Sequence, residues 1–159
     1  MMHRPGLMRE FDLEIFLDAP MGNGAAQLEN GSPIDVDLRL ESVHEGILAT
    51  AEVDATAKAE CVRCLDQMDI AVEVDFQELF AYSGVSEDDF AVENEQIDLE
   101  PVIRDEVVLS LPFQPVCSPD CQGLCPECGV KLAENPNHVH DQQVDSRWSE
   151  LENFRNKEE

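Results

Sequence analysis

The sequence predicts an α+β fold, built mainly on a bent antiparallel β-sheet with one main helix and a cysteine-rich C-terminal appendage plus a short helix. Three observations predict this fold: apolar and charged residues alternate through much of the first 80 residues, apolar residues recur at helical spacing after residue 98, and paired cysteines follow residue 116. We expect residues 1–112 to form the β-rich core with its helix. Residues 113–159 would add the Cys/His cluster and an anchoring helix, within one compact domain overall.

Four stretches carry the strand pattern. Apolar side chains alternate with polar or acidic ones in residues 11–17, 35–41, 47–61 and 69–77, which is typical of strands with one buried face. The third stretch is either one long bent strand or two shorter strands, and its inward alanines leave room for a bulky neighbour. Residues 18–33 are rich in Gly, Asn, Pro and Ala and are predicted to be a loop.

A chain reversal separates the last two predicted strands, and the sequence Cys61-Val62-Arg63-Cys64 lies on it. A strand that returns after so short a connection pairs antiparallel to the strand before it. A C-x2-C pair at the tip of such a hairpin is typical of a knuckle, in which backbone N–H groups face the thiolates.

The main helix is predicted to begin at Asp98, which is a suitable N-cap residue, and to end before Pro112. Its apolar stripe at helical spacing consists of Leu99, Val102, Ile103, Val107 and Leu111. A second, short helix is expected to open at Asp145. Trp148 and Leu151 would share one face of it and pack back on the domain.

The chain is strongly acidic. Thirty-five Asp and Glu against ten Lys and Arg give a net charge of −25 and a pI near 4.1, and residues 83–96 form a predicted acidic loop. Binding to a phosphate backbone depends on Lys and Arg, so this composition disfavours direct contact with RNA. A basic protein partner would be attracted instead, although the charge would equally well serve solubility alone.

No stretch approaches the roughly 20 consecutive apolar residues that a membrane-spanning helix needs. Residues 1–12 contain no apolar run long enough for a signal peptide. We therefore expect a soluble cytoplasmic protein that does not interact with membranes. The composition leaves the oligomeric state open.

Eight potential metal ligands stand in short-spaced pairs. They are Cys61, Cys64, Cys117, Cys121, Cys125, Cys128, His138 and His140. Thiolate sulfur and imidazole nitrogen in such pairs suit tetrahedral zinc, which takes four of these ligands in a closed structural site. The appendage is therefore predicted to be zinc-ribbon-like, and the eight ligands fit two closed zinc sites.

Two groupings of these ligands are open. In the preferred grouping, Cys61 and Cys64 join Cys117 and Cys121, and the four ligands from Cys125 to His140 form a second, local site. The first site would then tie the hairpin tip to the segment after the helix. In the rival grouping, the two C-x2-C knuckles share one ion, as in a zinc ribbon.

Two other uses of the cysteines compete with zinc. Disulfides need an oxidising compartment, and a redox dithiol favours a C-x2-C pair at the start of a helix, whereas Cys61 follows a predicted strand. Asp66, Asp69 and Glu73 lie nearby in the sequence. Because carboxylates raise the pKa of a neighbouring thiol, we expect no reactive thiolate in this pair.

Four motifs together resemble one protein family. They are E-C-x-R-C from residue 60, D-E-V-V-L-S-L-P from residue 105, C-x3-C-x-G-L-C-x2-C-G from residue 117 and D-x-R-W-x2-L from residue 145. In combination they resemble the YceD-like family, the large ribosomal RNA subunit accumulation proteins, over residues 35–155. Many members carry C-x-C near the position of His138 and His140, so imidazoles replace thiols in this chain.

The resemblance implies a role in the synthesis, processing or accumulation of large-subunit ribosomal RNA, and hence in ribosome biogenesis. Together with the acidic composition, it predicts a non-enzymatic zinc-binding factor that acts through a basic ribosomal protein or an rRNA-processing factor. The alternative is a thiol-based redox or zinc-sensing switch. A metal-dependent hydrolase would need an open coordination position, and the sequence has no Ser-His-Asp order, P-loop or dinucleotide fingerprint.

Overall fold

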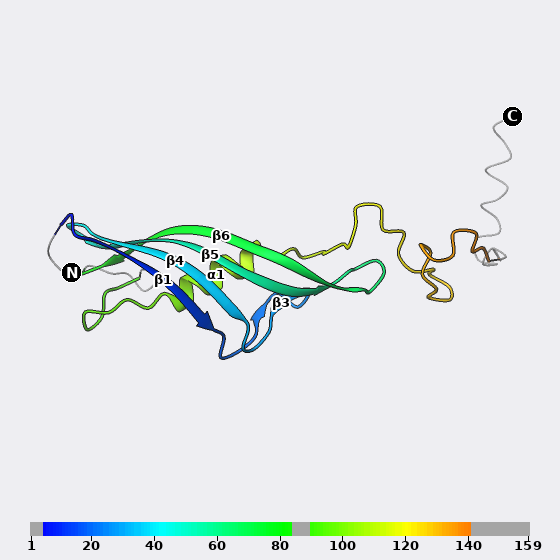
Figure 1. Cartoon of the computed structure of the whole chain (residues 1–159), viewed down its shortest axis with the longest axis horizontal. Helices are drawn as coiled ribbons and strands as arrows, with labels where there is room; N and C mark the ends of the chain where they lie inside the picture. Colours follow the sequence, from blue (N-terminus) through cyan, green and yellow to red (C-terminus); the bar gives the residue numbers. More distant parts are fainter. Residues whose placement is uncertain (1–4, 84–89, 141–159) are drawn as a thin grey trace, which may run out of the picture. The chain divides into compact units, whose positions relative to one another are not determined.

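A computed structural model describes residues 5–83 and 90–140 of the chain (Figure 1). The chain divides into two compact units, Met1–Cys121 and Gln122–Glu159. The short helix expected from Asp145 and part of the expected acidic loop, residues 84–89, lie outside the described residues.

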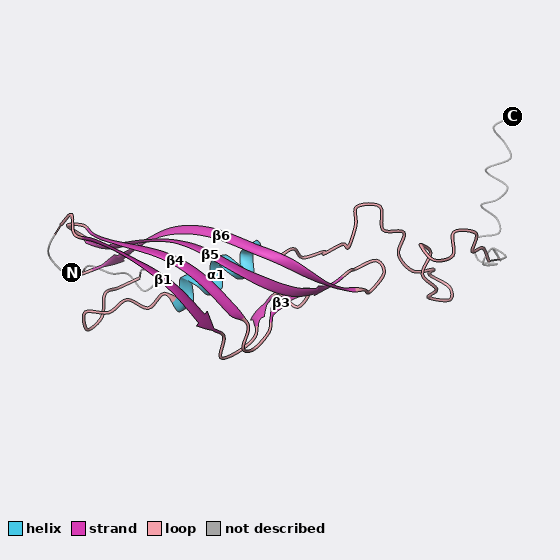
Figure 2. Cartoon of the chain, in the orientation of Figure 1, coloured by secondary structure: helices cyan, strands magenta, loops and turns pink. Residues whose placement is uncertain are grey.

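In the first unit, the described residues form a six-stranded antiparallel sheet and one helix (Figure 2). Its elements are β1 (Met8–Phe16), β2 (Met21–Gly22), β3 (Ala26–Leu28), β4 (Pro33–Ser42), β5 (Gly46–Glu60), β6 (Gln67–Ala81) and α1 (Glu100–Ser110). The long strands coincide with the stretches in which apolar and polar residues alternate, because that period places every apolar side chain on one face. β5 is a single strand of 15 residues, so the third stretch is not divided.

β5 is the strand on which the sheet is built. β6 pairs with it along its whole length on one edge, from Gly46↔Ala81 to Glu60↔Gln67. On the other edge β4 pairs with residues 47–55 and β3 with residues 58–59, while β1 lies outside β4 and β2 outside β3. The long strands bend together (Figure 1), which confirms the predicted bent, mainly antiparallel sheet with one helix.

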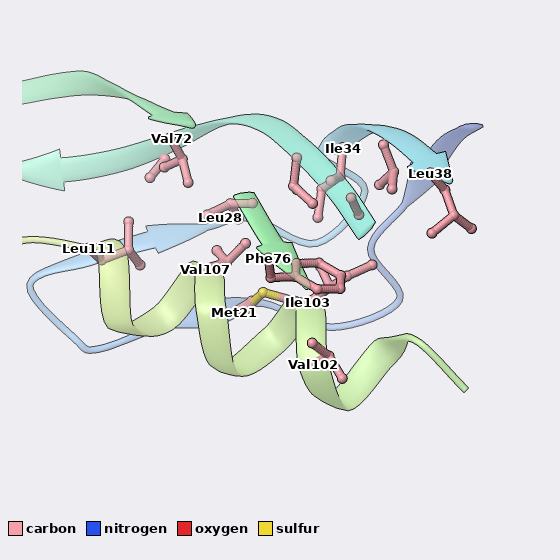
Figure 3. Packing of buried hydrophobic residues seen from close by; sticks show 14 of the residues in the cluster. Met21, Leu28, Ile34, Leu38, Val72, Phe76, Val102, Ile103, Val107 and Leu111 are labelled. Carbon is pink, nitrogen blue, oxygen red and sulfur yellow. The ribbon is translucent and has the colours of Figure 1, made fainter. Parts of the chain in front are cut away.

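The core lies between α1 and one face of the sheet. Val107 and Ile103 of α1 point towards the strands, among them Phe76 of β6 (Figure 3). The inward residues of β5 are mostly small, and Ala49 and Ala57 are completely buried. Removing side chains of the size of Val107 or Ile103 from water contributes about 1.5–3 kcal/mol each, and the small side chains of β5 give them the space to pack.

The prediction of a loop over residues 18–33 is wrong in part, because β2 and β3 lie within it. Ala26 and Gln27 pair with Ala59 and Lys58 at the far end of β5, and Met21 and Leu28 belong to the buried core. This order comes from pairing with a strand that is distant in the sequence. Local composition carries no sign of such a partner.

The boundaries of α1 differ slightly from the prediction. Leu99 occupies the N-cap position, and Asp98 lies one residue earlier, where its Oδ1 accepts the N–H of Glu100 at 3.0 Å. The helix ends at Ser110, before Pro112, as expected. In the described part of the chain, no helix has the length and apolar character needed to cross a membrane.

Two candidate metal centres

Cys61, Cys64, Cys117 and Cys121 converge in the first unit, and we call them the four-cysteine group. The Sγ atoms of Cys61 and Cys121 are 3.9 Å apart, those of Cys64 and Cys117 are 3.6 Å apart, and all four lie within 4.8 Å of one another. Four thiolates around a tetrahedral zinc at its usual Zn–S length are separated by about 3.8 Å. The group therefore has the spacing of a closed four-sulfur site.

The hairpin tip between β5 and β6 presents the first pair of this group. The turn closes through two hydrogen bonds, from the N–H of Leu65 to the oxygen of Cys61 and from the N–H of Cys61 to the oxygen of Asp66. Leu65 adopts a positive φ of 62°, an uncommon conformation for a branched residue. The tight reversal directs Cys61 and Cys64 inward, and both are buried.

The segment after α1 brings the second pair to the hairpin tip. The N–H of Val62 donates to the oxygen of Pro115 at 2.9 Å. The Arg63 side chain donates from Nη1 to the backbone oxygens of Pro119 and Cys121, at 3.1 and 3.0 Å. Residues between the two cysteines of the hairpin therefore hold the loop that carries Cys117 and Cys121.

Backbone amides set the acidity of Cys61. Hydrogen bonds from the amides of Cys117 and Cys64 lower its pKa to about 6, so the expectation of an elevated thiol pKa at this pair is wrong for Cys61. No carboxylate is among the causes of this shift, and the side chain of Asp66 contacts the other cysteine of the pair: the Cys64 Sγ donates to Asp66 Oδ2 at 3.4 Å.

Cys64 and Cys117 shift the other way. A hydrogen bond from the amide of Asp66 favours the Cys64 thiolate, but burial and the sulfur atoms of Cys61 and Cys117 outweigh it and raise the pKa of Cys64 to about 12. The side chain of Cys121 raises the pKa of Cys117. Four adjacent thiols cannot all ionise unaided, and a divalent cation among them removes that penalty.

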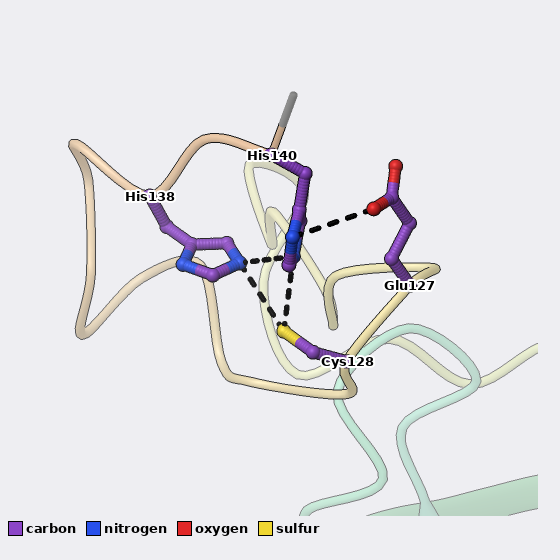
Figure 4. Close-up of polar contacts among 4 residues, drawn as sticks. All are labelled: Glu127, Cys128, His138 and His140. Atoms are coloured by element: carbon purple, nitrogen blue, oxygen red, sulfur yellow. Dashed lines mark hydrogen bonds and ion pairs between the residues drawn. The ribbon is translucent and has the colours of Figure 1, made fainter. Parts of the chain in front are cut away.

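Cys125, Cys128, His138 and His140 converge in the second unit, and we call them the cysteine–histidine group. The Cys128 Sγ lies 3.2 Å from Nε2 of His138 and 3.3 Å from Nε2 of His140. The two Nε2 atoms are 2.8 Å apart, and Figure 4 shows both rings directed at the same sulfur. The four ligand atoms lie within 4.8 Å of one another, which is compact enough to surround one metal ion.

A second knuckle carries the cysteines of this group. The N–H of Gly129 donates to the oxygen of Cys125, and the N–H of Cys125 donates to the oxygen of Val130, both at 2.8 Å. Gly129 has a φ of 73°, which glycine adopts without strain. Hydrogen bonds from the amides of Cys128 and Glu127 lower the pKa of Cys125 to about 6, so the local fold stabilises a thiolate.

Glu127 is a functional candidate that sequence reasoning missed. Its Oε2 lies 3.3 Å from Nδ1 of His140 (Figure 4). This contact fixes the ring so that Nε2 faces Cys128, and such carboxylate–histidine pairs orient metal ligands in many proteins. The available signal was its position inside the C-P-E-C knuckle.

All eight predicted ligands lie in one of the two groups, and the groups are those of the preferred pairing. Each group offers four ligand atoms of types that bind zinc, and either could hold a metal ion.

The chain is similar to one described protein family and to several bacterial proteins. The family described as "Large ribosomal RNA subunit accumulation protein YceD" matches residues 49–155. An uncharacterised protein of Mycobacterium tuberculosis is 45% identical over 155 residues, which cover 93% of this chain and 74% of that protein. The Bacillus subtilis protein YlbN is 25% identical over 126 residues, or 76% of this chain and 73% of YlbN.

A shorter match is with a Zea mays protein named "Large ribosomal RNA subunit accumulation protein YCED homolog 1, chloroplastic". The two are 40% identical over 43 residues, which cover 27% of this chain and 15% of the maize protein. No solved structure matches the chain.

Proposed function

The chain belongs to the YceD family of large ribosomal RNA subunit accumulation proteins, and from this premise we propose that it is a non-enzymatic, zinc-binding factor acting through basic protein partners. The family's name supports a role in ribosome biogenesis, as the four sequence motifs predicted. The synthesis, processing or accumulation of the large-subunit RNA is the step that we assign to it. A basic ribosomal protein or an rRNA-processing factor is the partner that its charge favours.

The two ligand groups support a structural use of zinc. Soft thiolates and imidazoles favour zinc over magnesium or calcium, which prefer oxygen ligands. Four protein ligands fill a tetrahedral zinc and leave no position for a reacting water. Zinc in these groups would hold loops together, which is the reason for assigning no catalytic role to them.

The assignment of a basic partner rests on the side of the sheet opposite α1, which we call the acidic face. Two rows of facing carboxylates cross four strands, and they are Asp12–Asp37–Glu52–Asp75 and Glu14–Asp35–Asp54–Glu73. All eight side chains are exposed. None of them forms an ion pair within residues 5–83 and 90–140.

Like charges that face one another across strands destabilise a sheet. This repulsion affects the acidity of Asp37. Partial desolvation and the neighbouring carboxylates of Asp12, Asp54 and Asp35 together raise the pKa of Asp37 above its ordinary value. A face that costs stability and has so few nearby cations is suited to a partner that brings positive charge. It is equally unsuited to gripping a phosphate backbone.

Cells that lack this protein provide the test. We expect the ratio of mature large-subunit to small-subunit rRNA to fall, and the wild-type protein to restore it. A variant with Asp12, Asp37 and Asp75 changed to Asn and Glu52 to Gln should restore it poorly. A control variant with the same loss of charge at exposed positions outside the face should restore it well; its changes are Glu95→Gln, Asp105→Asn, Asp120→Asn and Glu134→Gln. Equal rescue by both variants would refute the role of the acidic face.

A thiol-based redox or zinc-sensing switch is the second candidate, and the low pKa of Cys61 and Cys125 favours it. Thiolates react with peroxide much faster than thiols do. Two thiolates oxidised to a disulfide reduce one peroxide to water, and a site that loses two ligands releases its metal. Zinc release at low peroxide that a thiol reductant reverses would support this switch, whereas release only after irreversible oxidation would exclude it.

A further inference from the structure

β1 is an edge strand whose protection consists of charged side chains alone, those of Arg9, Glu10, Asp12 and Glu14. Among the described residues its one strand partner is β4, with which it pairs over nine positions from Met8↔Glu41 to Phe16↔Pro33 without a bulge. Natural edge strands are commonly guarded by Pro, Lys or a bulge. β1 contains neither Pro nor Lys. Its free edge is therefore a template on which another extended segment can pair.

The side of β1 that faces α1 is apolar and uncovered. Phe11, Leu13 and Ile15 are 37%, 39% and 38% exposed, whereas the β4 residues opposite them are in the buried core. The difference arises because α1 packs mainly on β6 and β2, and β1 lies at the edge of the sheet. A groove of about 170 Å³ lies beside this part of β1. Its apolar lining includes Leu13, Ile15, Leu17, Leu99 and Ile103.

The other side of β1 is acidic. Glu10, Asp12 and Glu14 alternate with the apolar residues, and Asp12 and Glu14 begin the two carboxylate rows of the acidic face. A strand added outside β1 would place every second side chain at the end of these rows. Its remaining side chains would lie beside Phe11, Leu13 and Ile15, on the same face of the sheet.

We propose that β1 binds an extended segment of the basic partner by strand addition, and that this segment alternates apolar residues with Lys or Arg. The apolar residues cover the exposed row of β1 and close the groove beside α1. The cations complete the two carboxylate rows, and the backbone of the segment satisfies the free edge. This inference rests on the proposed function and specifies where and how the partner docks.

Charge complementarity selects this occupant over a second copy of the chain. Two β1 strands paired with each other would place Glu10, Asp12 and Glu14 of one copy beside the same acidic side of the other. Facing like charges destabilise a strand pair, whereas a basic segment forms opposite-charge pairs at the same positions.

The test uses the full metal-bound chain and two synthetic peptides of identical composition. One peptide, K-I-K-V-K-I-K-V-K, alternates cationic and apolar residues, and the other groups its lysines at one end. We expect the alternating peptide to bind more tightly in fluorescence anisotropy. Amide hydrogen exchange should show new protection in β1 and none along the outer edge of β6.

Two charge-reversal variants locate the binding edge. Asp12→Lys with Glu14→Lys should weaken binding of the alternating peptide by about tenfold or more, because two cross-strand attractions become repulsions. Glu73→Lys with Asp75→Lys makes the same change at the β6 end of the same two rows and should weaken it much less. The milder variant, Asp12→Asn with Glu14→Gln, should weaken binding by an intermediate amount. It keeps the test informative if the charge-reversed β1 variant does not fold.

Each outcome separates this inference from the proposed function. Equal weakening by the two reversals, with no protection of β1, would overturn strand addition while leaving a basic partner in place. If neither peptide nor any basic ribosomal protein binds, the proposed function fails as well. A dimer whose β1 amides are protected without peptide would show that a second copy occupies the edge and would refute the basic occupant.

Discussion

The two ligand groups have similar chemistry but stand in different structural contexts. The four-cysteine group takes its ligands from the β5–β6 turn and from the segment after α1, and two of its cysteines are buried beside a sheet with its own core. The cysteine–histidine group takes all its ligands from residues 125–140. Between residues 122 and 140, Gly123 and Cys125 alone are buried.

Because of this difference, a metal ion would have a different structural role in each group. In the first unit, a metal would fasten two segments of a domain that hydrophobic burial already stabilises. In the second unit, the described residues have almost no apolar core, so the metal–ligand bonds would replace one. Metal binding and folding are then a single event there, as in other small metal-dependent modules.

Acidification should remove the metal ions from both ligand groups and so abolish the difference between the two units. The pKa of Cys61 and of Cys125 is lowered from 9.0 to about 6 by backbone hydrogen bonds. A lowered pKa favours the folded state above the ordinary value of 9.0, and that contribution is lost as the pH falls through about 6. We expect native mass spectrometry to find two zinc ions per chain near pH 7 and progressive loss below about pH 6. Full retention at about pH 4 would contradict this account.

Cys125→Ser should have the next largest effect, confined to the second unit. We expect the chain to retain one zinc and the amides of Gly129, Leu132 and His138 to lose their protection from hydrogen exchange. Their hydrogen bonds, to Cys125, Gly123 and Asn135, lie in a loop whose described residues, up to His140, have almost no apolar core. The amides of β5 serve as the internal control, and their protection should not change. Persistent protection at Gly129 would show that this loop folds without metal.

Cys64→Ser should have a smaller, local effect in the first unit. We expect one zinc to be lost, and the N–H of Val62 to exchange faster as its hydrogen bond to Pro115 opens. The sheet should remain folded because its core does not include the hairpin tip. Ser118→Ala, outside the ligand set, is the control and should keep both metals. Global unfolding of the sheet in the Cys64 variant would mean that this group, too, is required for folding.

The sequence was sufficient for features that depend on local periodicity. Alternating residues located β1, β4, β5 and β6. The spacing of the cysteines indicated the ligand pairs, because residues so close in the sequence can bend around one ion, but it left two groupings of these pairs open. Features set by distant partners were not predictable. β3 is ordered by the far end of β5, and the low pKa of Cys61 depends first on the amide of Cys117, which only the fold brings near.

Glu127 belongs with the features that the sequence could not identify, because a carboxylate between two cysteines has no visible partner until His140 folds back on it. Its contact through Nδ1 leaves Nε2 of His140 for the metal. Removing such a supporting carboxylate weakens metal binding by about 10–100-fold in comparable sites. We therefore expect Glu127→Gln to lower zinc affinity at the cysteine–histidine group alone, as measured by competition with a chromophoric chelator.

Glu134→Gln is the matched control. It also removes one exposed carboxylate from the same segment, and Glu134 is not a hydrogen-bond partner of any of the four ligands. It should leave the affinity of both groups unchanged. If the two variants behave alike, the Glu127 contact does not support the ligand, and the cysteine–histidine group owes its geometry to the knuckle and the His138 loop. A selective loss in the Glu127 variant would instead show that the exposed group relies on a neighbouring side chain for the orientation that the four-cysteine group obtains from the sheet.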